Sequence, residues 1–242
     1  MQPLLELEHV SKSFGAVVVA DDIDLRLEAG EALGVVGPNG AGKTTLLNLI
    51  AGTVPLDAGR IMFDGADITH LPPHRRCQAG MARTHQIPEP FEGLTVFENV
   101  LVGQRFGRSD AVEDPNGSAM TLIERVQLDP KANRLAGSLT LLERKRLELA
   151  RALATGPKML LLDEIGGGLV ETEIEVLIET IDDLRREGIT IVWIEHIVHV
   201  LVSVVDRLLA VDFGRVLAQG SPQEVMADPE VQAVYMGVVV EE

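Results

Sequence analysis

One glycine-rich stretch constrains this chain of 242 residues more than any other feature: Gly37-Pro38-Asn39-Gly40-Ala41-Gly42-Lys43-Thr44. It matches the phosphate-binding pattern G-x-x-x-x-G-K-[ST], and its flanks indicate a short buried strand over residues 31–36 and a helix over residues 43–51. Glycines let the backbone wrap around a phosphate chain, and the following helix adds its free N–H groups. The alternative is a glycine-rich turn that matches by chance, but the Lys-Thr pair and the flanks favour a nucleotide site. We expect Lys43 to reach the β- and γ-phosphates and Thr44 to ligate Mg²⁺.

Composition narrows the possible partners. A hydrophobic fraction of 46% with 24% charged residues is typical of a folded globular chain. The net charge of −16 argues against nucleic acid and against direct adhesion to anionic lipid. No apolar run is long enough to cross a bilayer, the N-terminal residues do not resemble a signal peptide, and the single Cys77 cannot form an internal disulfide. We therefore expect a cytoplasmic chain that meets a membrane only through a protein partner.

Two carboxylates follow the most apolar strand of the sequence. Residues 158–162 run on without polar alternation, which predicts a strand buried on both faces, and Asp163 and Glu164 end it. Carboxylates are costly at such a place unless they meet a cation or a reactive water. We expect Asp163 to hold Mg²⁺ through water and Glu164 to act as general base. The alternative is a solvated acidic pair at a strand end.

Three further residues are candidates because of where they lie. Gln86 follows a predicted strand at residues 80–84 and His196 follows another at residues 189–194, and ligands are usually met at such strand ends. Either is otherwise an ordinary loop residue. Phe14 lies in a predicted turn and either stacks on a purine ring or packs on the core. His196 and His199 lack an H-E-x-x-H pattern and a third ligand nearby, so we reject a metal site there.

The order of elements predicts an α/β fold with a mixed central sheet, an antiparallel layer near the N-terminus and an inserted helical subdomain. Residues 5–10 and 23–28 alternate apolar and polar, as strands with one wet face do. Residues 87–155 show only helical patterns, with a polar loop expected at residues 109–118 and helices at residues 119–127 and 140–154. We expect a core of residues 1–86 and 156–242 and an inserted subdomain of residues 87–155.

Taken in order, these motifs resemble the ATPase subunits of ABC transporters over essentially the whole chain. The resemblance implies catalytic roles for Glu164, His196, Lys43 and Gln86, and Mg²⁺ contacts from Thr44, Gln86 and Asp163. It implies nucleotide contacts, including adenine stacking by Phe14, from Phe14, Gly37, Pro38, Asn39, Gly40, Ala41, Gly42, Lys43, Thr44 and Thr45. The implied cofactors are ATP and Mg²⁺.

Within that family, residues 136–151 and the tail from Ala218 to Gly237 look similar to importers for branched-chain amino acids. Lipopolysaccharide-export and urea-import ATPases have comparable tails. The resemblance implies a second ATPase subunit in a homo- or heterodimer, permease subunits in the membrane and, indirectly, a solute-binding protein. It places the chain on the inner face of the cell membrane. The alternatives are a soluble ABC ATPase that serves no transporter and a nucleotide-binding regulatory subunit that hydrolyses little ATP.

The sequence departs from the family pattern at two places. The usual signature L-S-G-G-Q is replaced by Leu139-Thr140-Leu141-Leu142-Glu143, so both glycines are lost. The D-loop Asp or Asn is replaced by Val170, and Ile165 stands where a proline is usual. In the family these segments act on the nucleotide held by the opposite subunit. We hypothesise that this chain's own site is competent and that the site it completes for its partner is weakened.

Overall fold

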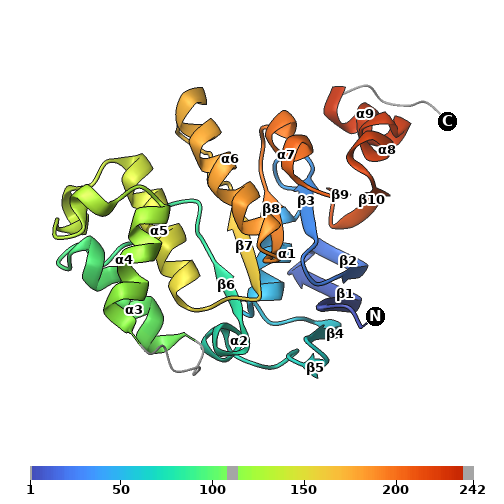
Figure 1. The fold of residues 1–242 in the computed structure, drawn as a ribbon. Helices are drawn as coiled ribbons and strands as arrows, with labels where there is room; N and C mark the ends of the chain where they lie inside the picture. The colour runs from blue at the N-terminus through green and yellow to red at the C-terminus, as the bar shows by residue number, and fades with distance from the viewer. Residues whose placement is uncertain (1, 108–113, 237–242) are drawn as a thin grey trace. The chain divides into compact units, whose positions relative to one another are not determined.

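The computed structural model describes residues 2–107 and 114–236, and its chain forms two compact units (Figure 1). Unit 1 comprises Met1–Pro73 and Thr190–Glu242, and unit 2 comprises His74–Ile189. Each unit is an α/β arrangement of its own. The predicted insertion of residues 87–155 falls inside unit 2, and its boundaries stay a prediction.

An antiparallel layer forms first in unit 1. Its strands, in the order β2-β1-β4-β5, are β2 (Val17–Leu27), β1 (Leu5–Phe14), β4 (Ala58–Phe63) and β5 (Ala66–Asp67). Leu5 and Leu7 are buried while Glu6 and Glu8 are not fully so, which is the alternation expected of a strand with one wet face. The predicted antiparallel layer is therefore confirmed. β1 continues beyond the predicted residues 5–10, so Phe14 ends a strand instead of lying within a turn.

A second set of strands carries the phosphate loop. In unit 1, β3 (Ala32–Val36) pairs in parallel with β8 (Thr190–Ile194) and with β9 (Arg207–Asp212), and β10 (Arg215–Gly220) is antiparallel to β9. Every residue of β3 and β8 is buried, because apolar side chains on both faces suit a covered parallel sheet. The helices of unit 1 are α1 (Lys43–Ala51), α7 (Val198–Val204), α8 (Pro222–Ala227) and α9 (Pro229–Met236).

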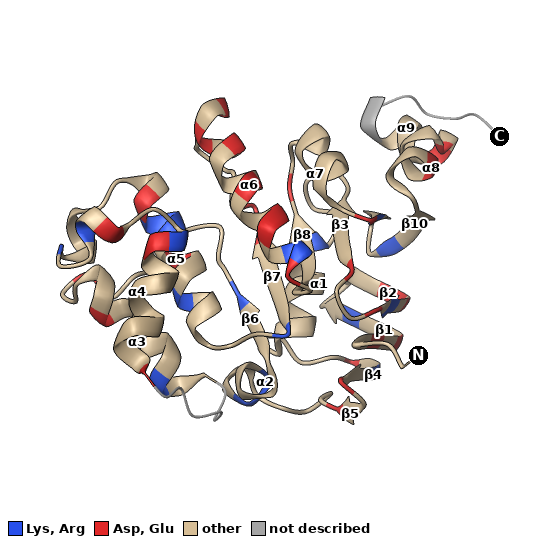
Figure 2. Ribbon diagram, viewed as in Figure 1, with Lys and Arg blue, Asp and Glu red and all other residues tan. Residues whose placement is uncertain are grey.

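Unit 2 combines a parallel strand pair with helices. β6 (Met81–Arg83) runs parallel to β7 (Met159–Asp163), whose five residues are all buried. The helices are α2 (Pro73–Ala79), which begins at the last residue of unit 1, α3 (Val96–Phe106), α4 (Pro115–Arg125), α5 (Leu141–Ala154) and α6 (Glu171–Arg186), with short 3-10 turns at Asp129–Lys131 and Ala136–Ser138. Figure 2 shows acidic residues along α6 and both acidic and basic residues on α5. Across residues 2–107 and 114–236, no helix has the length and apolar character needed to cross a bilayer.

Local signals set most helix starts. Thr95 and Glu98 form a capping box at the start of α3, and Gly52 ends α1 in a left-handed conformation with φ of 77°. The helix predicted at residues 119–127 is wrong in its bounds, because it begins at Pro115. Asp114 accepts a hydrogen bond from the Gly117 N–H at 3.0 Å, so an Asp-Pro pair caps and opens α4 inside the stretch predicted as loop. Residues 108–113 of that predicted loop lie outside the described residues.

Candidate nucleotide site

The phosphate loop, residues 37–44, joins β3 to α1 in unit 1. Lys43 is buried, with 5% of its surface exposed, and its ammonium donates to the carbonyls of Gly37 at 2.7 Å and Pro38 at 2.8 Å. The Lys43 side chain therefore lies against the phosphate loop, in which we expect it to bind phosphate. α1 begins after Gly42, which has no side chain to cap the helix, so N–H groups of the first turn are left for an anion.

Backbone packing in unit 1 holds this loop and explains two of its glycines. A Cβ on Gly37 would lie 2.1 Å from the carbonyl oxygen of Val211, and a Cβ on Gly42 would lie 2.4 Å from that of Val19. Both glycines have positive φ, 154° and 101°. A Cβ on Gly40 would meet nothing within 4 Å, so its position requires only a φ of 84°. The loop is thus fixed by contacts of main chain on main chain.

The two remaining candidates of unit 1 are accessible. Phe14 is 52% exposed at the end of β1, and the ammonium of Lys12 lies 5.3 Å from its ring centroid. An exposed ring face suits stacking on a base, although the role of Phe14 stays a prediction. His196 is exposed and directly follows Glu195 at the end of β8, where a strand-end residue was expected.

The acidic candidates of unit 2 are buried at the end of β7. Asp163 is 3% exposed, and the guanidinium Nη2 of Arg83 donates to its Oδ2 at 2.8 Å. Its other oxygen, Oδ1, is buried and has no hydrogen-bond partner among the described residues. A buried carboxylate oxygen without a partner is expensive, and a Mg²⁺-bound water would satisfy it. The donor set at Asp163 therefore fits the cation that the sequence predicted.

Glu164 has an unusual backbone. Its φ is 47°, a left-handed value that is uncommon for a residue with a side chain, and only 9% of its surface is exposed. Its carboxylate Oε2 accepts a short hydrogen bond from the amide Nε2 of Gln86. Its carbonyl accepts from the Gly167 N–H at 3.1 Å and from the Lys145 ammonium at 3.3 Å. Strained backbone of this kind is often found at functional sites.

The structure brings together several predicted and unpredicted residues in unit 2. Gln86 and Glu164 meet each other, and Arg83 and Lys145, which sequence reasoning did not single out, contact Asp163 and Glu164. We call this set, Arg83, Gln86, Lys145, Asp163 and Glu164, the carboxylate cluster. For Lys145 the available signal was a charge at a position that the periodicity of α5 assigns to the buried face, whereas β6 is too short to give such a signal for Arg83.

A second buried charge of α5 supports the same region. Glu148 is 8% exposed, and its Oε1 accepts from the backbone N–H of His85 at 2.7 Å and lies 2.8 Å from Nδ1 of the same residue. His85 directly precedes Gln86. The main chain leading to Gln86 is therefore anchored on α5.

The altered signature segment begins α5. Thr140 caps the helix. The Glu143 carboxylate accepts a hydrogen bond from the Thr140 N–H at 3.0 Å and forms an ion pair with the Lys131 ammonium. Burial acts to raise the pKa of Glu143, but the hydrogen bonds from Lys131 and Thr140 outweigh it and leave the pKa below its ordinary value. Leu141 is 44% exposed and Val170 is 62% exposed. Both departures from the family pattern therefore present apolar surface.

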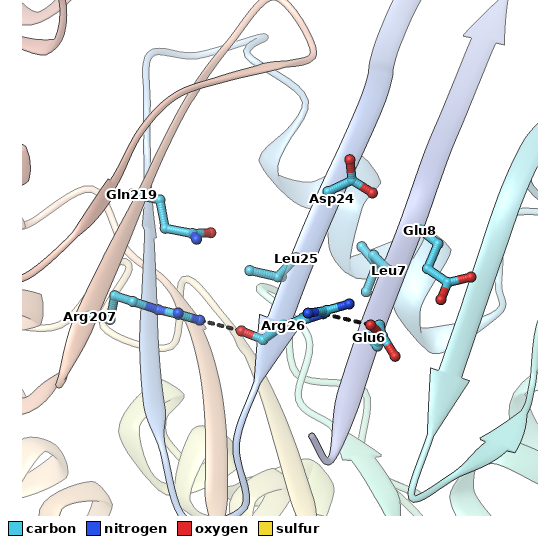
Figure 3. Close-up of a pocket in the computed structure, with 8 residues that line it drawn as sticks. All are labelled: Glu6, Leu7, Glu8, Asp24, Leu25, Arg26, Arg207 and Gln219. Atoms are coloured by element: carbon cyan, nitrogen blue, oxygen red, sulfur yellow. Dashed lines mark hydrogen bonds and ion pairs between the residues drawn. The ribbon is translucent and has the colours of Figure 1, made fainter. Parts of the chain in front are cut away.

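A surface groove of about 390 Å³ opens in unit 1 (Figure 3). Arg26 points to Glu6 and pairs with it at 2.6 Å, and Arg207 donates to the Arg26 carbonyl. Eight of the residues that the structure describes line this groove, and none of these eight is a predicted site residue. Among the described residues there is also no group of three or more His, Cys, Asp or Glu side chains placed to hold a metal ion by themselves.

Comparison with known proteins identifies the family of these motifs. A family model described as ABC transporter matches residues 20–166, and one described as branched-chain amino acid ATP-binding cassette transporter matches residues 215–241. The chain is 36% identical to the lipopolysaccharide export system ATP-binding protein LptB of Haemophilus influenzae over 97% of both chains. It is 33% identical to the high-affinity branched-chain amino acid transport ATP-binding protein BraF of Pseudomonas aeruginosa over 98% of both.

The fold has close solved counterparts. A nucleotide-free ATP-binding cassette from an ABC transporter superposes with a TM-score of 0.87 at 30% identity, covering 97% of this chain and 99% of that one. The nucleotide-binding interpretation of residues 37–44 therefore agrees with similarity over nearly the whole length of the chain.

Proposed function

Because the chain belongs to the ABC transporter family, as an ATP-hydrolysing subunit with the α/β P-loop fold of that family, we propose that it energises uptake of branched-chain or related amino acids through a membrane permease. The predicted fold class and ATPase activity are confirmed by these comparisons. The solute, the individual residue roles and the cellular position on the inner face of the membrane remain our proposals.

The observation that carries the solute proposal is the match of residues 215–241 to the branched-chain amino acid family. BraF, a relative named for the same solutes, supports it. The similarity to LptB, which is named for lipopolysaccharide export, favours the alternative that this chain serves another solute. The solute is therefore the finer claim, and it needs a direct test.

Transport by the intact assembly tests the solute. The chain would be tagged, purified from membranes with the subunits that accompany it, and reconstituted into liposomes containing ATP. We expect ATP-dependent accumulation of labelled leucine, isoleucine or valine, and stimulation of ATP turnover by these amino acids together with their binding protein. Stimulation by lipopolysaccharide or urea instead, with none by the amino acids, would overturn the solute proposal and leave the ATPase assignment intact.

We assign the chemistry to the residues as follows. The phosphate loop and Lys43 would bind the β- and γ-phosphates, Phe14 would stack on the adenine, and Thr44, Gln86 and Asp163 would hold Mg²⁺. When bound, Mg²⁺ neutralises charge on the phosphates. Glu164 accepts a proton from the attacking water, and His196 contacts the γ-phosphate. Held by Gln86 and by its left-handed backbone, the Glu164 carboxylate needs little reorganisation before it acts.

Replacement of Glu164 tests the assignment of the base. Glu164→Gln keeps the size of the side chain and removes its basicity, so we expect the kcat for ATP to fall by about 10² to 10⁴ with ATP still bound. The control is Glu173→Gln, a change at a half-buried residue of α6 whose carboxylate accepts the Val170 N–H at 3.0 Å. Equal turnover in the two variants would show that Glu164 is not the base and would favour a regulatory subunit.

A second hypothesis concerns the partner's nucleotide. Leu141 and Val170 are exposed where the family pattern has a glycine and an Asp or Asn. Leu141 therefore places a side chain where glycine leaves the backbone N–H groups open, and Val170 offers methyl groups in place of a carboxylate or amide. We infer a heterodimer in which this chain's own site turns over ATP and the site it completes is weak. Lys43→Ala in the assembled transporter should then abolish most ATP turnover. Turnover that survives this change would refute the asymmetry.

The segment after Gln86 is our candidate for the contact with the permease. Pro88, Phe91 and Leu94 follow Gln86, and Phe91 is 46% exposed. The Arg151 guanidinium lies 4.7 Å from the Phe91 ring centroid and donates to the Glu89 carbonyl at 2.9 Å, so α5 supports this segment. Cysteine crosslinking from position 91 should capture a permease subunit. Capture only from surfaces of unit 1 would exclude the segment.

A further inference from the structure

A lysine lies buried in the middle of α5 and contacts the segment that carries the predicted base. Lys145 is 2% exposed. Its ammonium lies 3.4 Å from the carbonyl oxygen of Gln86 and 3.3 Å from that of Glu164, within reach of both as a donor. Of the side chains of α5, it is the one that contacts the main chain of both residues in the described structure. Nothing in the phosphate-loop chemistry requires it.

Burying an ammonium group needs a reason. Removing such a charge from water is costly unless hydrogen bonds and opposite charge compensate it. A leucine would fill the same volume on an amphipathic helix without that cost. A lysine is therefore expected at this position only where its N–H donors form hydrogen bonds that a hydrocarbon side chain cannot form.

The two carbonyl oxygens that accept from Lys145 indicate the role of these hydrogen bonds. The Glu164 carbonyl belongs to a residue held at φ of 47°, and this conformation is strained for a residue with a side chain. The same carbonyl accepts from the Gly167 N–H, so two donors hold it. Gln86, the other acceptor, is the residue whose amide contacts the Glu164 carboxylate. One ammonium thus joins the main chains of two residues whose side chains also meet.

We propose that Lys145 is a positioning residue that holds Glu164 and Gln86 in their reactive arrangement and links that arrangement to α5. The proposal rests on the proposed role of Glu164 as base. The lysine donates to the Glu164 carbonyl, which keeps the left-handed turn closed and the carboxylate against Gln86. It touches no reacting atom itself, so it acts on turnover and not on the binding of nucleotide.

The position of Lys145 in α5 indicates how movement of this helix would reach Glu164. Thr140 caps α5 five residues earlier, so the altered signature segment and Lys145 are separated by about 7 Å of one continuous helix. Arg151, two turns further along, supports the segment with Phe91. A shift of α5 would therefore move the ammonium against the Glu164 carbonyl, and the base would respond to whatever moves the helix.

Substitution at position 145 tests the proposal in the transporter purified through the full-length chain. Lys145→Met keeps the aliphatic stem and removes the donors. We expect kcat to fall at least tenfold while the KM for ATP and the affinity for a fluorescent ATP analogue stay within about twofold, the pattern of an interaction needed only for turnover. Lys145→Arg restores donors and should recover much of the rate. Lys131→Met, which removes an ammonium that pairs with Glu143 in the first turn of α5, is the matched control.

A double variant decides between positioning and general support. If Lys145 acts through Glu164, Lys145→Met should cost nothing further in a Glu164→Gln background, because the group that it positions no longer acts. An equal loss in both backgrounds, or full activity of Lys145→Met, would overturn the proposal. If Glu164→Gln itself leaves kcat unchanged, the proposed function has failed instead. Should Lys145→Met not fold, the same cycle is run with Lys145→Gln, judged against Lys145→Arg.

Discussion

The phosphate loop of unit 1 and the carboxylate cluster of unit 2 hold their functional groups in different ways. The loop is shaped by main chain, with Gly37 and Gly42 packed against carbonyl oxygens and Lys43 bonded to carbonyls of its own loop. In the cluster, by contrast, Asp163 is held by the guanidinium of Arg83, and Glu164 is held through Gln86 and Lys145. Steric exclusion maintains the first arrangement and charge maintains the second.

This difference determines how each region fails. A loop fixed by close packing tolerates no added atom at its packed glycines, whatever the chemistry of that atom. A cluster fixed by buried charges fails when one partner is removed, because the remaining charge stays buried without compensation. The first two predictions below test these two modes against each other, and each compares two variants from the same unit.

The largest effect is expected in the carboxylate cluster. Arg83→Leu leaves the Asp163 carboxylate buried without its ion pair, and we expect the free energy of unfolding to fall by about 3–5 kcal/mol. Arg125→Leu removes an ion pair with the mostly exposed Glu187, and about 0–1 kcal/mol should be lost. Urea unfolding measures both. Equal losses would mean that charge does not hold the cluster.

The phosphate loop offers an internal comparison between two glycines. Gly40→Ala adds a methyl group to open space and should cost about 1–2 kcal/mol from its left-handed φ alone. Gly42→Ala has the same kind of strain and also places a Cβ 2.4 Å from the Val19 carbonyl oxygen, so it should cost more than Gly40→Ala and weaken ATP binding. Thermal unfolding with and without MgATP separates them. If the two variants behave alike, packing does not shape the loop.

A smaller effect is expected at a helix cap outside both regions. Thr95→Ala removes the side chain that accepts the Glu98 N–H at 3.1 Å, and we expect a loss of about 1 kcal/mol in unfolding free energy. Thr121→Ala is the control, since the Thr121 hydroxyl donates to the Gly117 carbonyl inside α4 and alanine favours a helix. If Thr121→Ala lowers the free energy of unfolding as much as Thr95→Ala does, the helix cap does not explain the loss.

The smallest effect is a change in acid sensitivity. The hydrogen bond from the Thr95 N–H, with help from the Thr95 hydroxyl, holds the pKa of Glu98 below its ordinary 4.5. A lowered folded-state pKa contributes stability that is present above pH 4.5 and is lost as the pH falls through the folded-state value. Glu98→Gln should therefore flatten the dependence of unfolding free energy on pH below that point. An unchanged pH profile in urea titrations would contradict this contribution.

Much of the fold follows from local patterns. The apolar run of β7, the alternation of β1 and the Thr95 capping box each involve residues only a few positions apart, so propensity and periodicity identify them. The same local logic failed at α4, where Asp114 and Pro115 look like loop residues by composition but act as a helix cap and a first helical residue.

The candidate site divides in the same way. A contiguous motif located the phosphate loop, and strand ends located Gln86, Asp163, Glu164 and His196. The partners of these residues were not visible. Arg83 lies 80 positions from Asp163, and Lys145 lies 59 positions from Gln86, so no period or spacing connects them.

By itself the sequence determined which groups could bind a nucleotide, because a phosphate loop needs a fixed order of glycines and a lysine over adjacent positions. Only the tertiary structure decided how the acidic residues are held. Burial makes each unpaired charge costly, and the chain satisfies that cost with donors that folding brings from distant segments. Which donors meet which carboxylates depends on packing, and packing is a property of the folded chain.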